Sequence, residues 1–206
     1  MREAIAVIGT AGRRTDAKRI NRALYDAMYE HLLAAIREWD VSAAVSGGAA
    51  VADHLAVRAF LEGAVSSLHL FLPAEFKERR YVPDGSAPYN PGATSNRYHQ
   101  AFSEACGINS LSEIAQAIEC GAITDVHPGF HTRNMEVAAS CTHMIAFTFG
   151  PRSDGHAPSV HADFLPNHPG FSDPSSAGLR DGGTAHTWSA AWKPIVKRHV
   201  RLDLIA

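Results

Sequence analysis

The feature that most constrains the fold is an alternation of apolar runs, glycine turns and helical patterns in the first third of the chain. In chain order these segments are 4–8, Gly9 to Gly12, 17–39, 41–46, Gly47-Gly48, about 50–61 and 68–73. Short continuous apolar runs are typical of parallel strands that are covered on both faces. Three such runs separated by two helices predict a βαβαβ unit, and right-handed crossovers arrange it as an open parallel sheet.

Two long segments without periodicity interrupt the rest of the chain. They lie at about 74–95 and 150–181 and are rich in proline and glycine. Between and after them we predict helices at about 96–106, 111–120, 132–140 and 185–192, and strands at 143–149 and 200–205. A loop at the carboxyl end of a strand lies where open α/β sheets bind ligands, so 74–95 is either a lid or a surface insertion without a role.

These elements predict a single doubly wound α/β domain over residues 1–206, with a mostly parallel sheet of five or more strands and helices on both faces. A length of 206 residues suits one such domain better than two small ones. Asp16 is the expected N-cap of the first long helix, and Gly63 is the expected stop of the second.

The composition of the chain indicates which classes of partner and which cell compartment to expect. The formal charge of −2 disfavours a nucleic-acid binder, which usually carries a basic stripe. No apolar run reaches the roughly 20 residues that a membrane helix needs. The first residues enter a strand pattern directly, so we expect no signal peptide. Three cysteines without CxxC spacing favour reduced thiols in a cytoplasmic protein.

Three glycine-containing loops are the candidate ligand site. Paired glycines between a strand and a helix leave backbone N–H groups at the positive end of a helix dipole, which suits a phosphate. The candidate residues are Gly9, Thr10, Gly12 and Arg13, then Ser46, Gly47, Gly48 and Ala49, and finally Gly182, Gly183 and Thr184. We expect these loops to surround one nucleotide-type ligand, although glycines also close many strand-to-helix turns that bind nothing.

Charged residues near these loops are candidates for chemistry. Arg133 and Glu136 lie on the helix before the fourth predicted strand, where an arginine and a carboxylate could face the same crevice. The carboxylate could hold a ribose hydroxyl or stabilise an oxocarbenium-like carbon; alternatively, the two form a solvated i, i+3 pair. Asp53 either caps its own helix or binds a ribose. The spacings of His156, His161 and His168 match no familiar metal site, and we expect neither metal nor cofactor.

These residues resemble the DprA/LOG-like (SLOG) superfamily of Rossmann-type nucleotide-binding proteins. Val7 to Arg13, Ser46 to Ala49 with Asp53, and Leu70 to Pro73 are similar to its first half. Arg133, the strand at 144–149 and Gly182-Gly183 follow in the order seen in the LOG hydrolases. The resemblance implies a nucleotide-derived ligand, an N-glycosidase (phosphoribohydrolase-like) activity and a homodimer.

Three positions depart from the patterns of this superfamily, one from the DprA-like loop and two from the LOG hydrolases. Val51 stands where a glycine continues the DprA-like loop, and Asp181 precedes the second diglycine in place of proline. The LOG catalytic glutamate is replaced by Ser189. Either Glu136, Asp53 or Asp181 then acts in its place, with Arg133 on the phosphate or ribose, or the protein is a non-catalytic nucleotide sensor. A DprA-like single-strand DNA binder is the third hypothesis.

Overall fold

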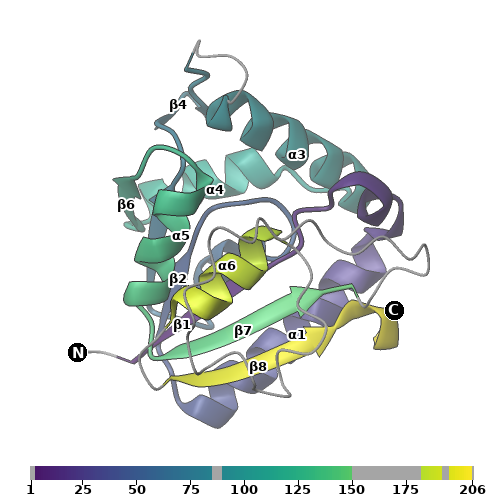
Figure 1. Ribbon diagram of the computed structural model, residues 1–206, viewed down its shortest axis with the longest axis vertical. Coiled ribbons are helices and arrows are strands. Elements are labelled where there is room, and N and C mark those ends of the chain that lie inside the picture. Colours follow the sequence, from purple (N-terminus) through teal and green to yellow (C-terminus); the bar gives the residue numbers. More distant parts are fainter. Residues whose placement is uncertain (1–2, 85–89, 150–181, 192–194, 206) are drawn as a thin grey trace.

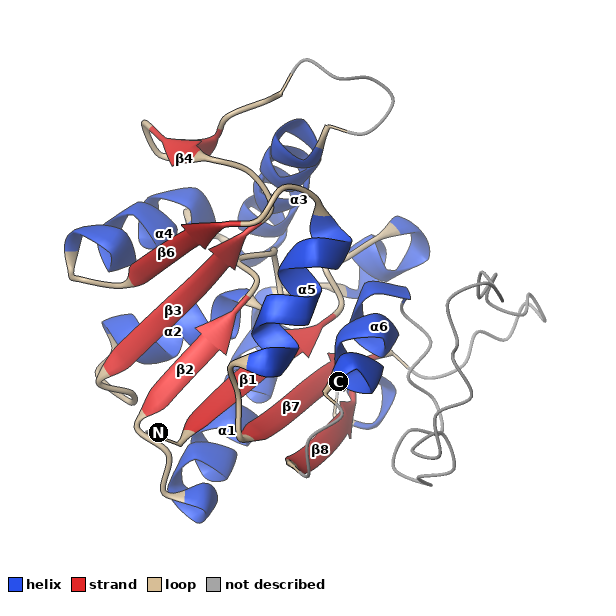
Figure 2. Ribbon diagram, turned by 60° about the vertical axis from the view of Figure 1, so that its left-hand side comes forward, coloured by secondary structure: helices blue, strands red, loops and turns tan. Residues whose placement is uncertain are grey.

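The computed structural model describes residues 3–84, 90–149, 182–191 and 195–205. Six parallel strands form one sheet in the order β6-β3-β2-β1-β7-β8 (Figure 2). The strands are β1 Ala4–Gly9, β2 Ala43–Ser46, β3 Ser67–Leu72, β6 Ile123–Val126, β7 His143–Thr148 and β8 Val196–Arg201. The helices are η1 Arg14–Arg19, α1 Arg22–Trp39, α2 His54–Leu61, α3 Pro91–Cys106, α4 Ser110–Glu119, α5 Phe130–Ala139, α6 Gly182–Ala190 and η5 Leu202–Leu204.

Both faces of the central strand β1 are buried. Ile5 and Val7 belong to a core cluster with α1, α2, α3 and α4. Ala6 and Ile8 point to the opposite face and belong to a second cluster with α5 and α6. Strand side chains alternate between faces, so a run that is apolar throughout requires a cover on each side. The doubly wound α/β architecture that the apolar runs predict is confirmed.

The chain changes direction across the sheet between β1 and β7. From β1 it steps outward through β2, β3 and β6, and it then returns through α5 to β7 on the other side of β1. Figures 1 and 2 show α5 and α6 together on one face of the sheet, with α1 behind it. In doubly wound sheets ligands bind at such a switch point, outside the carboxyl ends of the strands. The topology therefore predicts a ligand site at the carboxyl end of β1.

Two strands differ from the sequence prediction. The edge strand β6 was not predicted, because Ile123–Val126 is only four residues long and all four are exposed. It pairs in parallel with β3. The last strand occupies Val196–Arg201 and not 200–205; the residues that follow it form the short helix η5. The consecutive polar residues Lys197, Arg198 and His199 conceal the true start of this strand, because they interrupt the apolar pattern.

The starts of helices α1 and α3 also differ from the sequence prediction. The prediction that Asp16 caps the first long helix is wrong, since Asp16 lies within η1. The Asn21 side chain caps α1 instead, accepting a hydrogen bond from the Leu24 N–H. Helix α3 starts at Pro91, with Asn90 as its cap, and not near residue 96. Asn followed by Pro at the first helical position is a recognised start signal. Gly63 has φ +76 just beyond α2, as a helix stop requires.

The first long segment contains a small hairpin. Strands β4 Phe76–Lys77 and β5 Arg80–Tyr81 pair antiparallel there. The second segment, 150–181, lies outside the described residues, as does Trp192. Within the described ranges no helix has the length and apolar character needed to cross a bilayer.

Candidate functional site

A small pocket opens at the carboxyl end of β1, and we call it the β1 pocket. Its free volume is about 40 Å³, room for a few water molecules or for a small polar group. Helices α5 and α6 supply one wall, and the loops after β1 and β2 supply the other. It is lined by Ile8, Gly9, Ala11, Arg13, Ala49, Asp53, Phe130, Arg133, Asn134, Val137, Gly183, Thr184 and Thr187. All three predicted glycine loops therefore contribute to one pocket.

A buried ion pair crosses the pocket. Arg133 Nη1 on α5 lies 3.0 Å from Asp53 Oδ2, just before α2, and both side chains are less than a tenth exposed. Burial raises the pKa of Asp53, while the neighbouring Arg133 guanidinium opposes this shift. The pair joins elements 80 residues apart in sequence across the end of the sheet. Arg133 does not pair with Glu136, so the alternative of an i, i+3 surface pair is excluded.

Glycines allow close approach around this pair. A Cβ built on Gly47 would lie 1.3 Å from Arg133 Nη1, so only glycine leaves space for the guanidinium. A Cβ on Gly9 would lie 2.2 Å from the carbonyl oxygen of Phe147. These two glycines therefore bring backbone and arginine together at the end of the sheet, a structural role that does not itself require a ligand.

The loop after β2 turns its N–H groups toward residues of the protein. The Ala49 N–H points to Asp53 Oδ2 at 3.5 Å, and the backbone of Gly47 also lowers the pKa of this carboxyl. Ser46 Oγ accepts from the Gly48 N–H at 3.2 Å and donates to the Asp53 carbonyl at 2.8 Å. The diglycine loop thus holds the Asp53 carboxylate where we had predicted that it would hold a phosphate.

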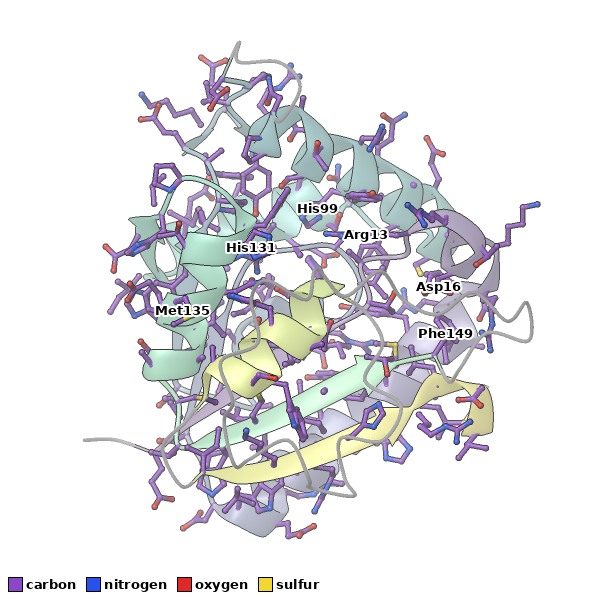
Figure 3. All side chains as sticks on the ribbon, in the orientation of Figure 1. Arg13, Asp16, His99, His131, Met135 and Phe149 are labelled. Atoms are coloured by element: carbon purple, nitrogen blue, oxygen red, sulfur yellow. The ribbon has the colours of Figure 1, made fainter. Side chains whose placement is uncertain are left out.

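Several hydrogen-bond donors of the pocket have no partner among the described residues. Arg13 Nε, Arg133 Nε and Thr184 Oγ1 are buried atoms without a hydrogen bond. Buried polar groups are nearly always satisfied, so such atoms commonly mark a missing ion, water or ligand. Figure 3 shows Arg13 beside the upper end of α6, whereas Met135 lies on the outer part of α5. With Arg13, Arg133 and Asp53 as its charged lining, the pocket has a formal charge of +1.

The first turn of α6 adds further donors. The helix begins at Gly182, and Gly183 and Thr184 line the pocket. The second diglycine is therefore part of the helix and not a separate turn before it, as the sequence had suggested. The first N–H groups of a helix have no partner within that helix and attract anions. Asn134 Nδ2 on α5 donates to the Gly183 carbonyl, which fixes α6 against α5. Thr187 Oγ1 donates to the same carbonyl from within α6.

The predicted ligand residues divide into two groups. Those that line the pocket are Gly9, Arg13, Ala49, Asp53, Gly183 and Thr184, together with Arg133. Those that do not line it are Thr10, Gly12, Ser46, Gly47 and Gly48, and Gly182 is the first residue of α6. Thr10, for example, has its N–H bonded to Phe147 O and its Oγ1 bonded to the Gly12 N–H. This second group shapes the loops around the pocket.

Glu136, the predicted catalytic carboxylate, does not line the pocket. Its side chain is 42% exposed and faces His127 Nδ1 at 3.9 Å. Arg133 and Val137 occupy the inner face of α5, so the residue next to Val137 points elsewhere. Ser189 is exposed on α6, and Asp181 lies outside the described residues. Asp53 is consequently the only carboxylate in the described lining.

Sequence reasoning missed Phe130, Asn134 and Thr187. Thr187 lies one helical turn after Gly183, so helical spacing from a predicted residue could have identified it. Asn134 follows Arg133 directly, and helical spacing does not select it. Within the described part of the chain, no three potential metal ligands cluster together. His156, His161 and His168 lie outside that part.

Comparisons with known proteins place the chain in a family. No family model matches it. It is 35% identical over 158 residues to "Uncharacterized protein R261" of Acanthamoeba polyphaga mimivirus, which covers 73% of this chain and 84% of that protein. A solved structure of DNA processing protein A (DprA) from Streptococcus pneumoniae aligns with 96% of this chain at 12% identity and a TM-score of 0.34, and this chain spans 58% of its length. The identity and coverage of the first match show that the chain belongs to the same family as the mimivirus protein.

Proposed function

We propose that the β1 pocket binds a phosphoribosyl-containing small molecule, such as a nucleoside monophosphate. The observation that carries this proposal is the set of buried donors without partners, Arg13 Nε, Arg133 Nε and Thr184 Oγ1, around a pocket with a formal charge of +1. A phosphate would accept hydrogen bonds from these donors and would complete the anion site at the first turn of α6.

Asp53 supports the ribose part of the proposal. Its carboxyl group lines the same pocket and pairs with Arg133. A carboxylate can accept hydrogen bonds from both hydroxyls of a ribose, as acidic residues do in dinucleotide-binding sheets. A pocket that combines these donors with a carboxylate fits a sugar phosphate better than it fits free phosphate. The free volume of about 40 Å³ suits only the phosphate, so the sugar and base would extend toward the opening.

Binding without cleavage is the form of the proposal that the site favours. Glu136 faces His127, Ser189 is exposed, and Asp53 is already engaged by Arg133 and by the Ala49 N–H. Asp53 is the sole carboxylate among the described lining residues, and its Oδ2 is held by Arg133 and the Ala49 N–H, which suits an acceptor for a hydroxyl better than a group that attacks a sugar carbon. A role as a nucleotide sensor therefore has priority over the N-glycosidase that the LOG resemblance implies.

The test is a ligand panel read by calorimetry and by chromatography of released base. It contains nucleoside monophosphates, ribose 5-phosphate, NAD, ADP-ribose, the matching nucleosides and single-stranded DNA. We expect the monophosphates and ribose 5-phosphate to bind, nucleosides to bind far more weakly, and no base to be released. Base release that disappears in Asp53→Asn but persists in Glu136→Gln would instead establish an enzyme. DNA binding that falls steeply with salt would favour the DNA-processing hypothesis.

A matched pair of variants localises the site. Arg13 and Arg97 both lie over the Tyr98 ring, at 5.7 and 5.3 Å, but only Arg13 lines the pocket. Arg13→Gln should weaken binding about tenfold or more, because it removes a charged donor, while Arg97→Gln should leave the affinity within about twofold. Equal effects of the two changes would show that binding depends on surface charge and not on the pocket.

A further inference from the structure

The carbonyl oxygen of Gly48 accepts hydrogen bonds from two side chains that are distant in sequence. Tyr81 Oη donates to it at 2.5 Å, and His99 Nε2 lies 3.0 Å from it. Both side chains are fully buried, one at the end of the β4–β5 hairpin and the other on α3. A carbonyl oxygen has two lone pairs, so the two donors use its full capacity. The diglycine loop is therefore held from the side opposite the β1 pocket.

The direction of each proton follows from the partners. A carbonyl only accepts, so the Nε2 of His99 must carry the proton. Its Nδ1 then accepts from Ser110 Oγ at 3.0 Å, and Ser110 Oγ lies 2.8 Å from Ser103 Oγ. Burial lowers the pKa of His99 to about 4, so the ring is neutral at physiological pH, as this arrangement requires. The network fixes the tautomer of His99.

Peptide geometry transmits this contact to the pocket. In a planar trans peptide the C=O of Gly48 and the N–H of Ala49 point in opposite directions. With the carbonyl held by Tyr81 and His99, the Ala49 N–H points to Asp53 Oδ2 at 3.5 Å. Two donors on one carbonyl also polarise the amide and strengthen its N–H as a donor. A rotated peptide would instead turn a carbonyl oxygen toward the carboxylate.

Gly48 is suited to this contact. Its φ of +64 favours glycine, and a Cβ there would lie 2.7 Å from Tyr81 Oη and 2.6 Å from Leu72 Cδ2. Any other residue would displace the tyrosine hydroxyl from the carbonyl.

We propose that His99 and Tyr81 are positioning residues of the β1 pocket: they orient the Gly48–Ala49 peptide so that its N–H holds the Asp53 carboxylate ready for a ligand hydroxyl. The ligand part rests on the proposed function. The positioning part does not, because it concerns the free protein. A network that only satisfies buried polar groups would contribute to stability without affecting Asp53.

The first experiment uses ligand-free protein. Four variants are compared by NMR: Tyr81→Phe, His99→Leu, His99→Gln and the control Tyr25→Phe. Tyr25 Oη lies 2.9 Å from His54 Nδ1, so the control removes a buried tyrosine hydrogen bond made to the residue next to Asp53 and not to the Gly48 carbonyl. We expect Tyr81→Phe and His99→Leu to shift the Ala49 amide resonance and to raise the pKa of Asp53, measured from its carboxyl carbon. Tyr25→Phe should change neither.

The glutamine variant separates positioning from packing. Its side-chain amide can donate near the position of Nε2, so His99→Gln should restore the Ala49 resonance and the Asp53 pKa toward the wild-type values. The proposal is overturned if Tyr81→Phe leaves both signals in place, or if it moves them no more than Tyr25→Phe does. Tyr81→Phe keeps the ring and alone suffices for this test should His99→Leu fail to fold.

The second experiment measures affinity for adenosine 5′-monophosphate. Tyr81→Phe should weaken binding about fivefold, the equivalent of one oriented hydrogen bond, and Tyr25→Phe should leave it unchanged. Wild-type protein that binds no monophosphate would refute the proposed function, while the NMR comparison still decides the positioning role. Wild-type binding with unchanged affinity in Tyr81→Phe would refute the positioning role alone.

Discussion

The Arg133–Asp53 pair yields the sharpest prediction about stability. Arg133→Leu leaves a carboxylate buried without its partner, in a side chain that is less than a tenth exposed. Removing one member of such a pair usually costs about 3–5 kcal/mol of unfolding free energy. Arg22→Leu is the control, since it removes an exposed pair with a similar distance, 2.9 Å from Asp26, and should cost less than about 1 kcal/mol.

The unfolding free energy lost in Arg133→Leu should depend on pH, and the environment of Asp53 determines the direction of this dependence. Burial already raises the pKa of Asp53, and Arg133 is the largest influence in the opposite direction. When a carboxyl has a higher pKa in the folded state than in the unfolded state, the protein loses unfolding free energy as the pH rises from the unfolded to the folded pKa. Removing Arg133 extends that window upward. The cost of Arg133→Leu should therefore be greater at pH 7.5 than at pH 5, by about 1–3 kcal/mol.

Urea unfolding of the four members of a double-mutant cycle measures these quantities. Adding Asp53→Asn to Arg133→Leu removes the buried charge, so the double variant should be more stable than Arg133→Leu at pH 7.5. A cost below about 1 kcal/mol for Arg133→Leu, an equal cost at both pH values, or a double variant no more stable than the single one would refute the description of this pair as buried and ionised.

Three further predictions concern the surrounding structure. Burial lowers the pKa of His54 to about 3 and that of His99 to about 4. The unfolding free energy should therefore decrease as the pH falls from 6.5 to 4, by up to about 1.4 kcal/mol per pH unit for each histidine. The decrease should be smaller in His54→Gln. Gly48→Ala should destabilise the protein by about 1–3 kcal/mol in thermal unfolding, because its Cβ would meet Leu72 and Tyr81. Light scattering should show a dimer, as the LOG resemblance implies; a monomer at micromolar concentration would remove that expectation.

The fold could be predicted largely from apolar runs. The run at 4–8 predicts a strand buried on both faces, and Ile5 and Ile8 do pack in opposite clusters. The start of α3 was misplaced because the Asn90-Pro91 signal was counted as part of a loop. Strand β6 was beyond prediction, since four exposed residues at a sheet edge carry no apolar pattern. It exists because β3 offers it backbone hydrogen bonds.

The sequence predicted where the site lies better than it predicted what the residues of the site do. Glycines and arginines near strand ends identify the carboxyl edge of the sheet, and Arg13, Arg133 and Gly183 do meet there. Sequence could not show that Gly47 makes room for Arg133, or that the diglycine loop holds Asp53, because both depend on contacts across about 80 residues or on loop conformation. The position of Glu136 outside the pocket lining could not be foreseen for a related reason: helical spacing alone does not say which face of α5 is inward.

The most direct test of the central claim is an NMR titration of labelled protein with ribose 5-phosphate and adenosine 5′-monophosphate. The account predicts that both ligands shift the amides of Ala49, Gly183 and Thr184, which line the β1 pocket, and that adenosine at the same concentration does not. The contradicting result would be unchanged pocket amides, or shifts confined to the groove between α1 and α2 that Arg22 and Arg58 line.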